Sequence, residues 1–271
     1  MIEGSMSKNC TCWVISLNPA SENTQKLIAD LAAQGLNAEI FPAVDGRAGM
    51  PSLEGDERFL DDLAMVRHGK HLTASELGCY LSHLRAAKQA YDEGYQHICL
   101  MEEDVVIEPL FGDVYRSVLD KELDMVRMMS LRIRKRVVLD KLVGEHRLVR
   151  PVRGGLGAQA YVLNRAGMKK LFTYGQKIYE PIDKVMDHFF LFDLQVFAVE
   201  PHVAHELVHE TSVQKAADTN DETPRLWHRL AFHPVKLWFS LRRHFYRFCH
   251  RGDFSGATLP SKKVGRTERV H

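Results

Sequence analysis

Residues 97–108, HICLMEEDVVIE, form the stretch around which the chain is organised. The run ICLM after the histidine is long enough for a buried strand and too short for a helix. Glu102, Glu103 and Asp104 follow at once, and such carboxylates are costly to bury unless a positive charge, such as a divalent cation with oxygen ligands, compensates them. In an extended chain, Glu102 and Asp104 would point to one side and Glu103 to the other. The stretch predicts a metal or substrate site at a strand end, with a solvated strand end as the alternative.

Length and composition suit one large domain or a domain with a small appendage, since the chain has 271 residues and 45% of them are hydrophobic. We expect neither a membrane-spanning helix nor a secretory signal, because no long apolar span occurs. The five cysteines are scattered through apolar segments, as is usual for reduced thiols. Residues 1–5, just before Met6, look like a remnant of an expression tag.

Basic residues are concentrated near the C-terminus. Residues 224–251 contain seven Lys or Arg and no acid, although the whole chain has a net charge of only +1. This imbalance argues against a general nucleic-acid binder and for a local contact with an anionic surface. We therefore divide the chain into a catalytic-type domain over residues 6–222, a basic amphipathic helical segment over 223–251 and a flexible tail over 252–271.

The order of predicted elements indicates an α/β fold. Residues 13–17 and 38–44 are predicted strands joined by a helix that Ser21 caps, which is typical of a parallel sheet with a crossover helix. Thr73 and Glu76 form a capping box that begins a long helix leading into the acid-bearing strand. His83 lies in that helix, where a structural role and a ligand role are both open.

The chain resembles glycosyltransferase family 25, which includes bacterial lipooligosaccharide enzymes and procollagen galactosyltransferases. The matching pieces follow the family's order: residues 14–18 (VISLN), 42–46 (PAVDG), 76–83 (ELGCYLSH), 101–105 (MEEDV), 157–163 (GAQAYVL), 181–183 (PID) and 200–201 (EP). Two features depart from the family pattern: Glu103 replaces the usual middle Asp, and the loop after the first strand lacks the usual arginines. The resemblance implies a GT-A-like, mostly parallel sheet flanked by helices, a nucleotide-sugar donor, a divalent metal and an inverting transfer.

The resemblance also suggests roles for individual residues. Asp104 is the expected direct ligand of Mn²⁺ or Mg²⁺, and Glu102 is expected to bind the metal through water or to bind the donor ribose. Asp183 is the candidate general base, although it could instead serve as a carboxylate at a helix N-terminus, and Asp187 could substitute for it. The remaining expected donor contacts are Glu103, Asn18, Asp45 and Gly157. A late histidine could complete the metal shell, and we take His209 as the candidate although the sequence does not distinguish it from His202 and His205.

These features predict an inverting, metal-dependent enzyme that transfers galactose from UDP-galactose to a lipooligosaccharide or lipopolysaccharide core sugar. A UDP-glucose transferase, a nucleotidyltransferase making an activated sugar and a non-catalytic membrane-surface module are the alternatives. We expect the protein at the cytoplasmic face of a bacterial inner membrane, in contact with the lipid through an amphipathic helix over residues 234–249. Packing of that helix on the protein's own core is the competing interpretation.

Overall fold

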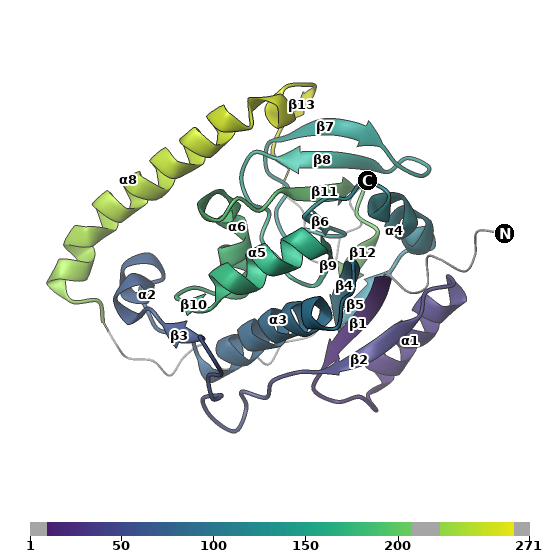
Figure 1. The fold of residues 1–271 in the computed structure, drawn as a ribbon, viewed down its shortest axis with the longest axis horizontal. Coiled ribbons are helices and arrows are strands. Elements are labelled where there is room, and N and C mark those ends of the chain that lie inside the picture. The colour runs from purple at the N-terminus through teal and green to yellow at the C-terminus, as the bar shows by residue number, and fades with distance from the viewer. Residues whose placement is uncertain (1–9, 208–222, 263–271) are drawn as a thin grey trace.

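A computed structural model describes residues 10–207 and 223–262 and shows one central sheet covered by helices (Figure 1). The nine strands run in the order β13-β7-β8-β11-β6-β9-β4-β1-β2. Their bounds are β1 Cys10–Ser16, β2 Ala38–Pro42, β4 His97–Glu102, β6 Met125–Arg127, β7 Arg136–Lys141, β8 Arg147–Pro151, β9 Ala160–Asn164, β11 Val196–Glu200 and β13 Thr258–Leu259. The α/β fold class predicted from the sequence is confirmed.

The sheet is mixed in direction. The pairs β1–β2, β1–β4 and β6–β11 are parallel, whereas β9 lies antiparallel between β4 and β6, and β7, β8 and β13 extend the sheet in antiparallel pairs. Parallel neighbours need a long crossover, such as α1 between β1 and β2, while β7 and β8 are joined by a short hairpin. The parallel part that the sequence predicted therefore comprises β1, β2 and β4, whose carboxyl ends meet at one edge.

Helices cover both faces of this sheet and bury alternate strand residues. On one face lie α1 (Glu22–Ala33) and α4 (Phe111–Leu119), which pack with Cys12 and Val14 of β1. On the other face lie α3 (Ala74–Asp92), α5 (Arg165–Gly175) and α6 (Ile182–Asp187), which pack with Trp13 and Ile15. Because both faces are covered, the central strands read as continuous apolar runs.

The capping box predicted at the start of α3 is present. The Thr73 side chain accepts a hydrogen bond from the Glu76 amide at 3.2 Å, and the Glu76 carboxylate accepts one from the Thr73 amide at 2.8 Å. The Tyr80 hydroxyl then ties α3 to α5 through the carbonyl of Gly175. These contacts fix the helix that delivers the chain into β4 and its acids.

Smaller elements complete the fold. Residues 47–69 contain β3 (Arg58–Phe59) and α2 (Asp61–Arg67), and β3 pairs with β10 (Lys177–Ile178). Beyond the acids, β5 (Val105–Ile107) pairs antiparallel with β12 (Ala204–Glu206).

The C-terminal segment is part of the folded unit. Helix α8 (Leu226–Cys249) packs against α2 and the short 3-10 helix η2 (Phe189–Leu191). Residues 252–262 of the expected flexible tail instead belong to η3 (Arg251–Phe254) and β13, because Thr258 and Leu259 find hydrogen-bonding partners on the free edge of β7. The suspected tag remnant, residues 1–5, lies outside the described residues. Across the described parts of the chain, no helix combines the length and the apolar character needed to cross a bilayer.

Candidate active-site cleft

A cleft with a cavity volume of about 320 Å³ opens where the parallel strands β1 and β4 end. Its walls come from the start of α1, the segment after β2, the first turns of α3 and the three acids after β4. Ligands of open α/β sheets bind at this edge, beyond the carboxyl ends of parallel strands. The structure therefore places Glu102, Glu103 and Asp104 in a cleft, where the sequence predicted a site.

The three carboxylates do not lie on one extended strand. Strand β4 ends at Glu102, and Glu103 and Asp104 form a turn into β5. The condition under which Glu102 and Asp104 were expected to point to one side, an extended chain through Asp104, is therefore not met. Each acid has its own surroundings, and these surroundings indicate different roles.

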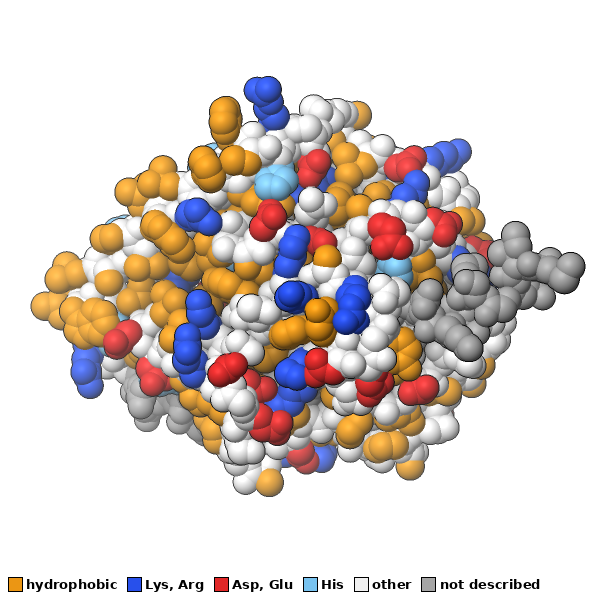
Figure 2. Space-filling model, in the orientation of Figure 1, with side chains coloured by type: hydrophobic (Ala, Val, Ile, Leu, Met, Phe, Trp, Pro, Cys, Tyr) orange, Lys and Arg blue, Asp and Glu red, His pale blue; other side chains and the backbone are white. Residues whose placement is uncertain are grey.

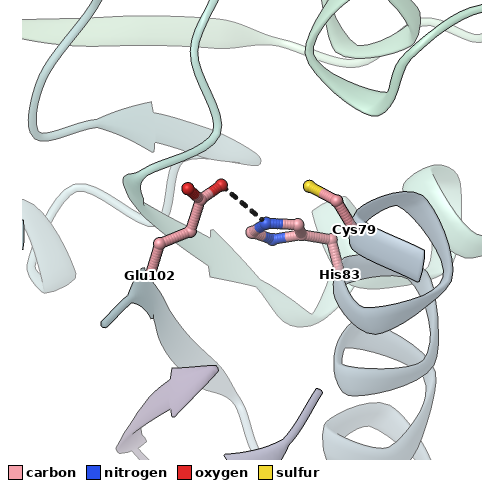
Figure 3. A group of neighbouring side chains, drawn as sticks. All are labelled: Cys79, His83 and Glu102. Atoms are coloured by element: carbon pink, nitrogen blue, oxygen red, sulfur yellow. Dashed lines mark hydrogen bonds and ion pairs between the residues drawn. The ribbon is translucent and has the colours of Figure 1, made fainter. Parts of the chain in front are cut away.

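Glu102 lies against two side chains of α3 (Figure 3). Its Oε1 is 3.2 Å from Nε2 of His83, whose other ring nitrogen is 3.0 Å from the Tyr161 hydroxyl. The Cys79 sulfur lies close by, and one potential ligand atom from each of Cys79, His83 and Glu102 falls within 4.8 Å of the others. His83 is thus a site residue that sequence reasoning left open, although the i, i+4 spacing of Cys79 and His83 on a helix entering the acid strand was a usable signal.

The surroundings of the Asp104 carboxylate favour a bound cation. Burial, together with the negative charges of Glu102 and Glu206, raises the pKa of Asp104 to about 8. Its Oδ1 is buried and has no hydrogen-bond partner among the described residues. Such a buried oxygen among other carboxylates fits a divalent metal with oxygen ligands. Glu206 was missed by sequence reasoning because only the pairing of β12 with β5 brings it here.

Glu103 is held by hydroxyl groups. The hydroxyl of Ser16 and that of Thr24, at 2.9 Å, both donate to its Oε2. These bonds tie the acid turn to the end of β1 and the first turn of α1. Glu103 lines the cleft, but this oxygen is already engaged, so the side chain positions the turn more than it offers a free ligand.

Asp183 sits at the start of α6, held by backbone amides. Its Oδ2 accepts from Gly157 at 3.3 Å and its Oδ1 from Lys184 at 2.7 Å. Gly157 has a φ of +89°, and an added Cβ would lie 2.6 Å from the Gln159 amide oxygen, so this turn requires glycine. The Gly157 amide, expected to contact the donor, binds Asp183 in this structure.

Asp183 does not line the cleft, but its charge acts on Cys79, which does. Burial, followed by the charges of Glu102, Asp183 and Asp104, raises the pKa of this thiol well above its ordinary value. Carboxylates from β4 and α6 therefore lie around the cleft-lining Cys79. Asp187, in contrast, forms a 2.7 Å ion pair with the buried Arg127 and accepts from the Leu156 amide, so it cannot substitute for Asp183 as a base.

Two further expected donor contacts lie beside the cleft lining. Asn18 accepts a hydrogen bond from the Ala20 amide at 3.3 Å and shapes the turn before α1, whereas Asn23 lines the cleft. Asp45 forms a two-pronged contact with Arg47, whose guanidinium lowers the pKa of Asp45 to about 2. Arg47 itself lines the cleft and supplies a cation that sequence reasoning sought in the loop after β1.

The late histidines do not join the acids within the described chain. His202 is half-buried, and its desolvation followed by the charge of Arg136 lowers its pKa to about 4. His205 lies 3.2 Å from a Glu108 oxygen. His209, the candidate metal ligand from the sequence, lies outside the described residues, so its role stays a prediction.

Known proteins share this sequence pattern. The profile described as glycosyltransferase family 25 (LPS biosynthesis protein) matches residues 9–186. The chain therefore belongs to glycosyltransferase family 25, as the resemblance in the sequence suggested.

Individual relatives are distant and longer than this chain. A procollagen galactosyltransferase 1 of Danio rerio is 25% identical over 236 residues, which cover 79% of this chain and 39% of that protein. An inactive glycosyltransferase 25 family member 3 of Homo sapiens is 25% identical over 235 residues, covering 78% and 39%. The chain thus spans about two fifths of the length of these relatives. A mutant Drosophila galactosyltransferase 7, solved with manganese, UDP-Gal and xylobiose, superposes with a TM-score of 0.41 at 12% identity over 82% of this chain and 79% of the other.

Proposed function

We propose that the protein is an inverting, metal-dependent glycosyltransferase that moves galactose from UDP-galactose to a lipooligosaccharide or lipopolysaccharide core sugar. The observation that carries the proposal is the unsatisfied, buried oxygen of Asp104 among carboxylates in a cleft of a family 25 chain. The name of the zebrafish relative supports galactose, and the description of the family supports a lipopolysaccharide acceptor.

Asp104 and Glu102 are the residues that would hold the metal. A bound Mn²⁺ or Mg²⁺ would act as a Lewis acid and stabilise the negative charge on the departing UDP diphosphate. Oxygen ligands suit both ions, whereas the thiol of Cys79 suits neither well, so Cys79 is the weakest member of the Cys79, His83 and Glu102 group for this purpose. His83 instead orients Glu102 through the 3.2 Å contact between them.

Arg47 is the cleft-lining guanidinium that would contact the donor's phosphates. Its Nε and one terminal nitrogen hold Asp45, which leaves the other terminal nitrogen able to donate toward the cleft. Arg47 therefore takes the part that arginines after the first strand play in the family pattern.

Asp183 is the proposed general base. Inversion in a single displacement requires a base that takes the proton from the attacking acceptor hydroxyl. The amides of Gly157 and Lys184 each donate a hydrogen bond to the Asp183 carboxylate and hold it in place. These two hydrogen bonds keep the carboxylate oriented for proton transfer.

The alternatives differ in testable ways. A nucleotidyltransferase would use a glycine-rich, basic loop after the first strand, and this chain has Asn18-Pro19-Ala20-Ser21 there. A non-catalytic binding module remains a real alternative because the human relative is named as inactive.

The deciding experiment measures turnover of UDP-galactose and UDP-glucose with Mn²⁺, Mg²⁺ or EDTA, using lipooligosaccharide as acceptor. We expect metal-dependent UDP release and galactose transfer with a β-linked product, and loss of both in Asp104→Ala. Binding of UDP with Mn²⁺ but no turnover of either donor would contradict the proposal and favour the binding module.

A further inference from the structure

Helix α8 presents three different faces to its surroundings. The face toward the protein contains Val235, Phe239 and Tyr246. The Phe239 ring packs on His188 at 4.9 Å between ring centres, and the Tyr246 hydroxyl accepts a 2.7 Å hydrogen bond from Arg150. This face accounts for the core-packing interpretation of the helix and holds it in a fixed orientation.

The opposite face is apolar and exposed. Of the twelve large hydrophobic residues that are exposed in the described chain, eight lie on this one helix, between 45% and 74% exposed. They are Leu226, Trp227, Leu230, Leu237, Trp238, Leu241, Phe245 and Phe248. They are one, three, four or seven residues apart, and at about 100° per residue these spacings place them on one side of the helix. Figure 2 shows hydrophobic side chains gathered along the left and upper-left margin, where α8 runs in Figure 1.

The amphipathic pattern over residues 234–249 indicates a single broad apolar face that includes both exposed and buried residues. The structure separates them, because Phe239 and Tyr246 pack on the protein while Trp238, Leu241 and Phe245 remain exposed. Packing on the core therefore buries only part of the apolar surface of the helix. An exposed apolar stripe of this size indicates a further binding partner.

Cations border the exposed stripe and lack acidic partners. Helix α8 contains no acid. Within the described chain, His228 of α8 and His250 just after it form ion pairs with carboxylates, whereas the Lys and Arg residues of α8 form none. Arg229, Lys236 and Arg242 are exposed. Burial, followed by the charges of three other arginines, lowers the pKa of the half-buried Arg243. The border of the stripe is therefore positive, and no carboxylate of residues 10–207 or 223–262 forms an ion pair with its Lys or Arg side chains.

We propose that α8 docks the protein on an anionic lipid membrane, lying in the plane of the surface. Its Leu, Phe and Trp side chains would enter the boundary between headgroups and acyl chains, while Arg229, Lys236 and Arg242 would contact lipid phosphates. No described helix is suited to cross the bilayer, so the interaction is peripheral. A second copy of the chain fits less well, since symmetric packing of α8 on α8 would bring two positive borders together without an acid between them.

Docking would also bring the side of the molecule that carries Asp183 toward the lipid surface. Helix α2 packs on α8, and His68, just after α2, lies 3.0 Å from the Lys184 side-chain nitrogen, next to Asp183. A lipid-anchored acceptor would then reach the catalytic site from the bound membrane. This consequence rests on the proposed function, whereas the docking itself does not.

The test uses the full chain and vesicles of phosphatidylcholine with or without phosphatidylglycerol, at low and at high salt. Co-sedimentation gives the bound fraction, and tryptophan fluorescence reports insertion. The chain has three tryptophans, and Trp13 is buried, so a blue shift on vesicle binding comes from Trp227 and Trp238. We expect binding and a blue shift with anionic vesicles at low salt, and at least roughly tenfold weaker binding with neutral vesicles or at high salt.

Two matched variants test the face itself. Serine replacements of four residues of the stripe, Leu237, Trp238, Leu241 and Phe245, should reduce the affinity for anionic vesicles by at least roughly tenfold. Serine replacements of the four exposed hydrophobic residues elsewhere, Met50, Phe59, Leu110 and Leu139, should leave it unchanged. Thermal melts establish that both variants remain folded.

A charge variant provides an independent check that does not alter apolar surface. Replacing Arg229, Lys236 and Arg242 by Gln should remove most of the salt dependence of vesicle binding.

Failure of the wild type to bind anionic vesicles would overturn the proposal, as would equal binding by the stripe variant. A sedimentation experiment in which the stripe variant converts a dimer to a monomer, without vesicle binding by the wild type, would assign the face to a contact between copies instead. None of these readouts uses glycosyl transfer, so their results are independent of the turnover assay.

Discussion

Replacing Asp104 by Asn should stabilise the metal-free protein and remove its response to Mn²⁺. The pKa of Asp104 is raised from 3.8 to about 8 by burial, followed by the charges of Glu102 and Glu206. A carboxyl group with a raised pKa favours the folded state when it is protonated. Stability is therefore present below pH 3.8 and is lost as the pH rises toward about 8. Asparagine keeps the shape of the side chain and carries no charge at any of these pH values.

The size of the effect follows from the shift. Each pKa unit corresponds to about 1.4 kcal/mol, so a shift of this size would cost on the order of 5 kcal/mol at pH 8 if Asp104 titrated alone. Because Glu102 and Glu206 share protons with it, we expect roughly half of this value, about 2 to 3 kcal/mol. For a chain of this length that corresponds to a rise in melting temperature of roughly 4 to 12 °C.

The assay is thermal unfolding in EDTA at a series of pH values from about 4 to 8, followed by melts with added Mn²⁺. The difference between Asp104→Asn and the wild type should grow with pH, and only the wild type should gain strongly from Mn²⁺. Asp56→Asn, which removes an exposed carboxylate, is the control and should follow the wild type. A variant that melts below the wild type at pH 8 in EDTA, or that keeps the full Mn²⁺ response, would refute the reasoning.

Three further substitutions test other parts of the site. Asp183→Asn should lower the transfer rate by at least roughly a hundredfold while UDP binding measured by calorimetry stays the same, and substantial remaining turnover would place the base elsewhere. Gly154→Ala should lower the free energy of unfolding by about 3 kcal/mol, because the new Cβ would lie 1.8 Å from the carboxyl carbon of the ion-paired Asp187. Its control is Gly252→Ala, where an added Cβ meets nothing within 4 Å, and equal melting temperatures of the two variants would contradict the clash. His83→Ala should raise the Mn²⁺ concentration needed for half-maximal activity by roughly ten- to a hundredfold, and an unchanged requirement would exclude a role in orienting the metal site.

Features that depend on neighbouring residues were predictable from the sequence. The apolar run before Glu102 and the capping box of Thr73 and Glu76 act over a few residues, and both are found where the sequence placed them. The α/β class followed from the order of such segments. The location of the acids at a strand end followed from the same local pattern.

Roles that depend on distant segments were not predictable. Glu103 looked equivalent to its neighbours, but Ser16 and Thr24, which bind it, lie 87 and 79 residues away in the sequence. Asp187 and Asp183 are interchangeable as candidate bases in the sequence, but in the structure Arg127, on β6, forms an ion pair with Asp187. Both of these faces of α8 are apolar in the sequence, and only the packing of α2 and η2 against the helix decides which one is covered.

The sequence by itself therefore determined the elements, the family and the position of the acids along the chain, because local hydrogen bonding and the alternation of apolar residues decide these. Only the tertiary structure decided which acid lacks a partner, which histidine meets Glu102 and which face of α8 stays exposed. The physical reason is that the charge state and exposure of a side chain depend on burial and on partners, and most of those partners arrive from segments far apart in the chain.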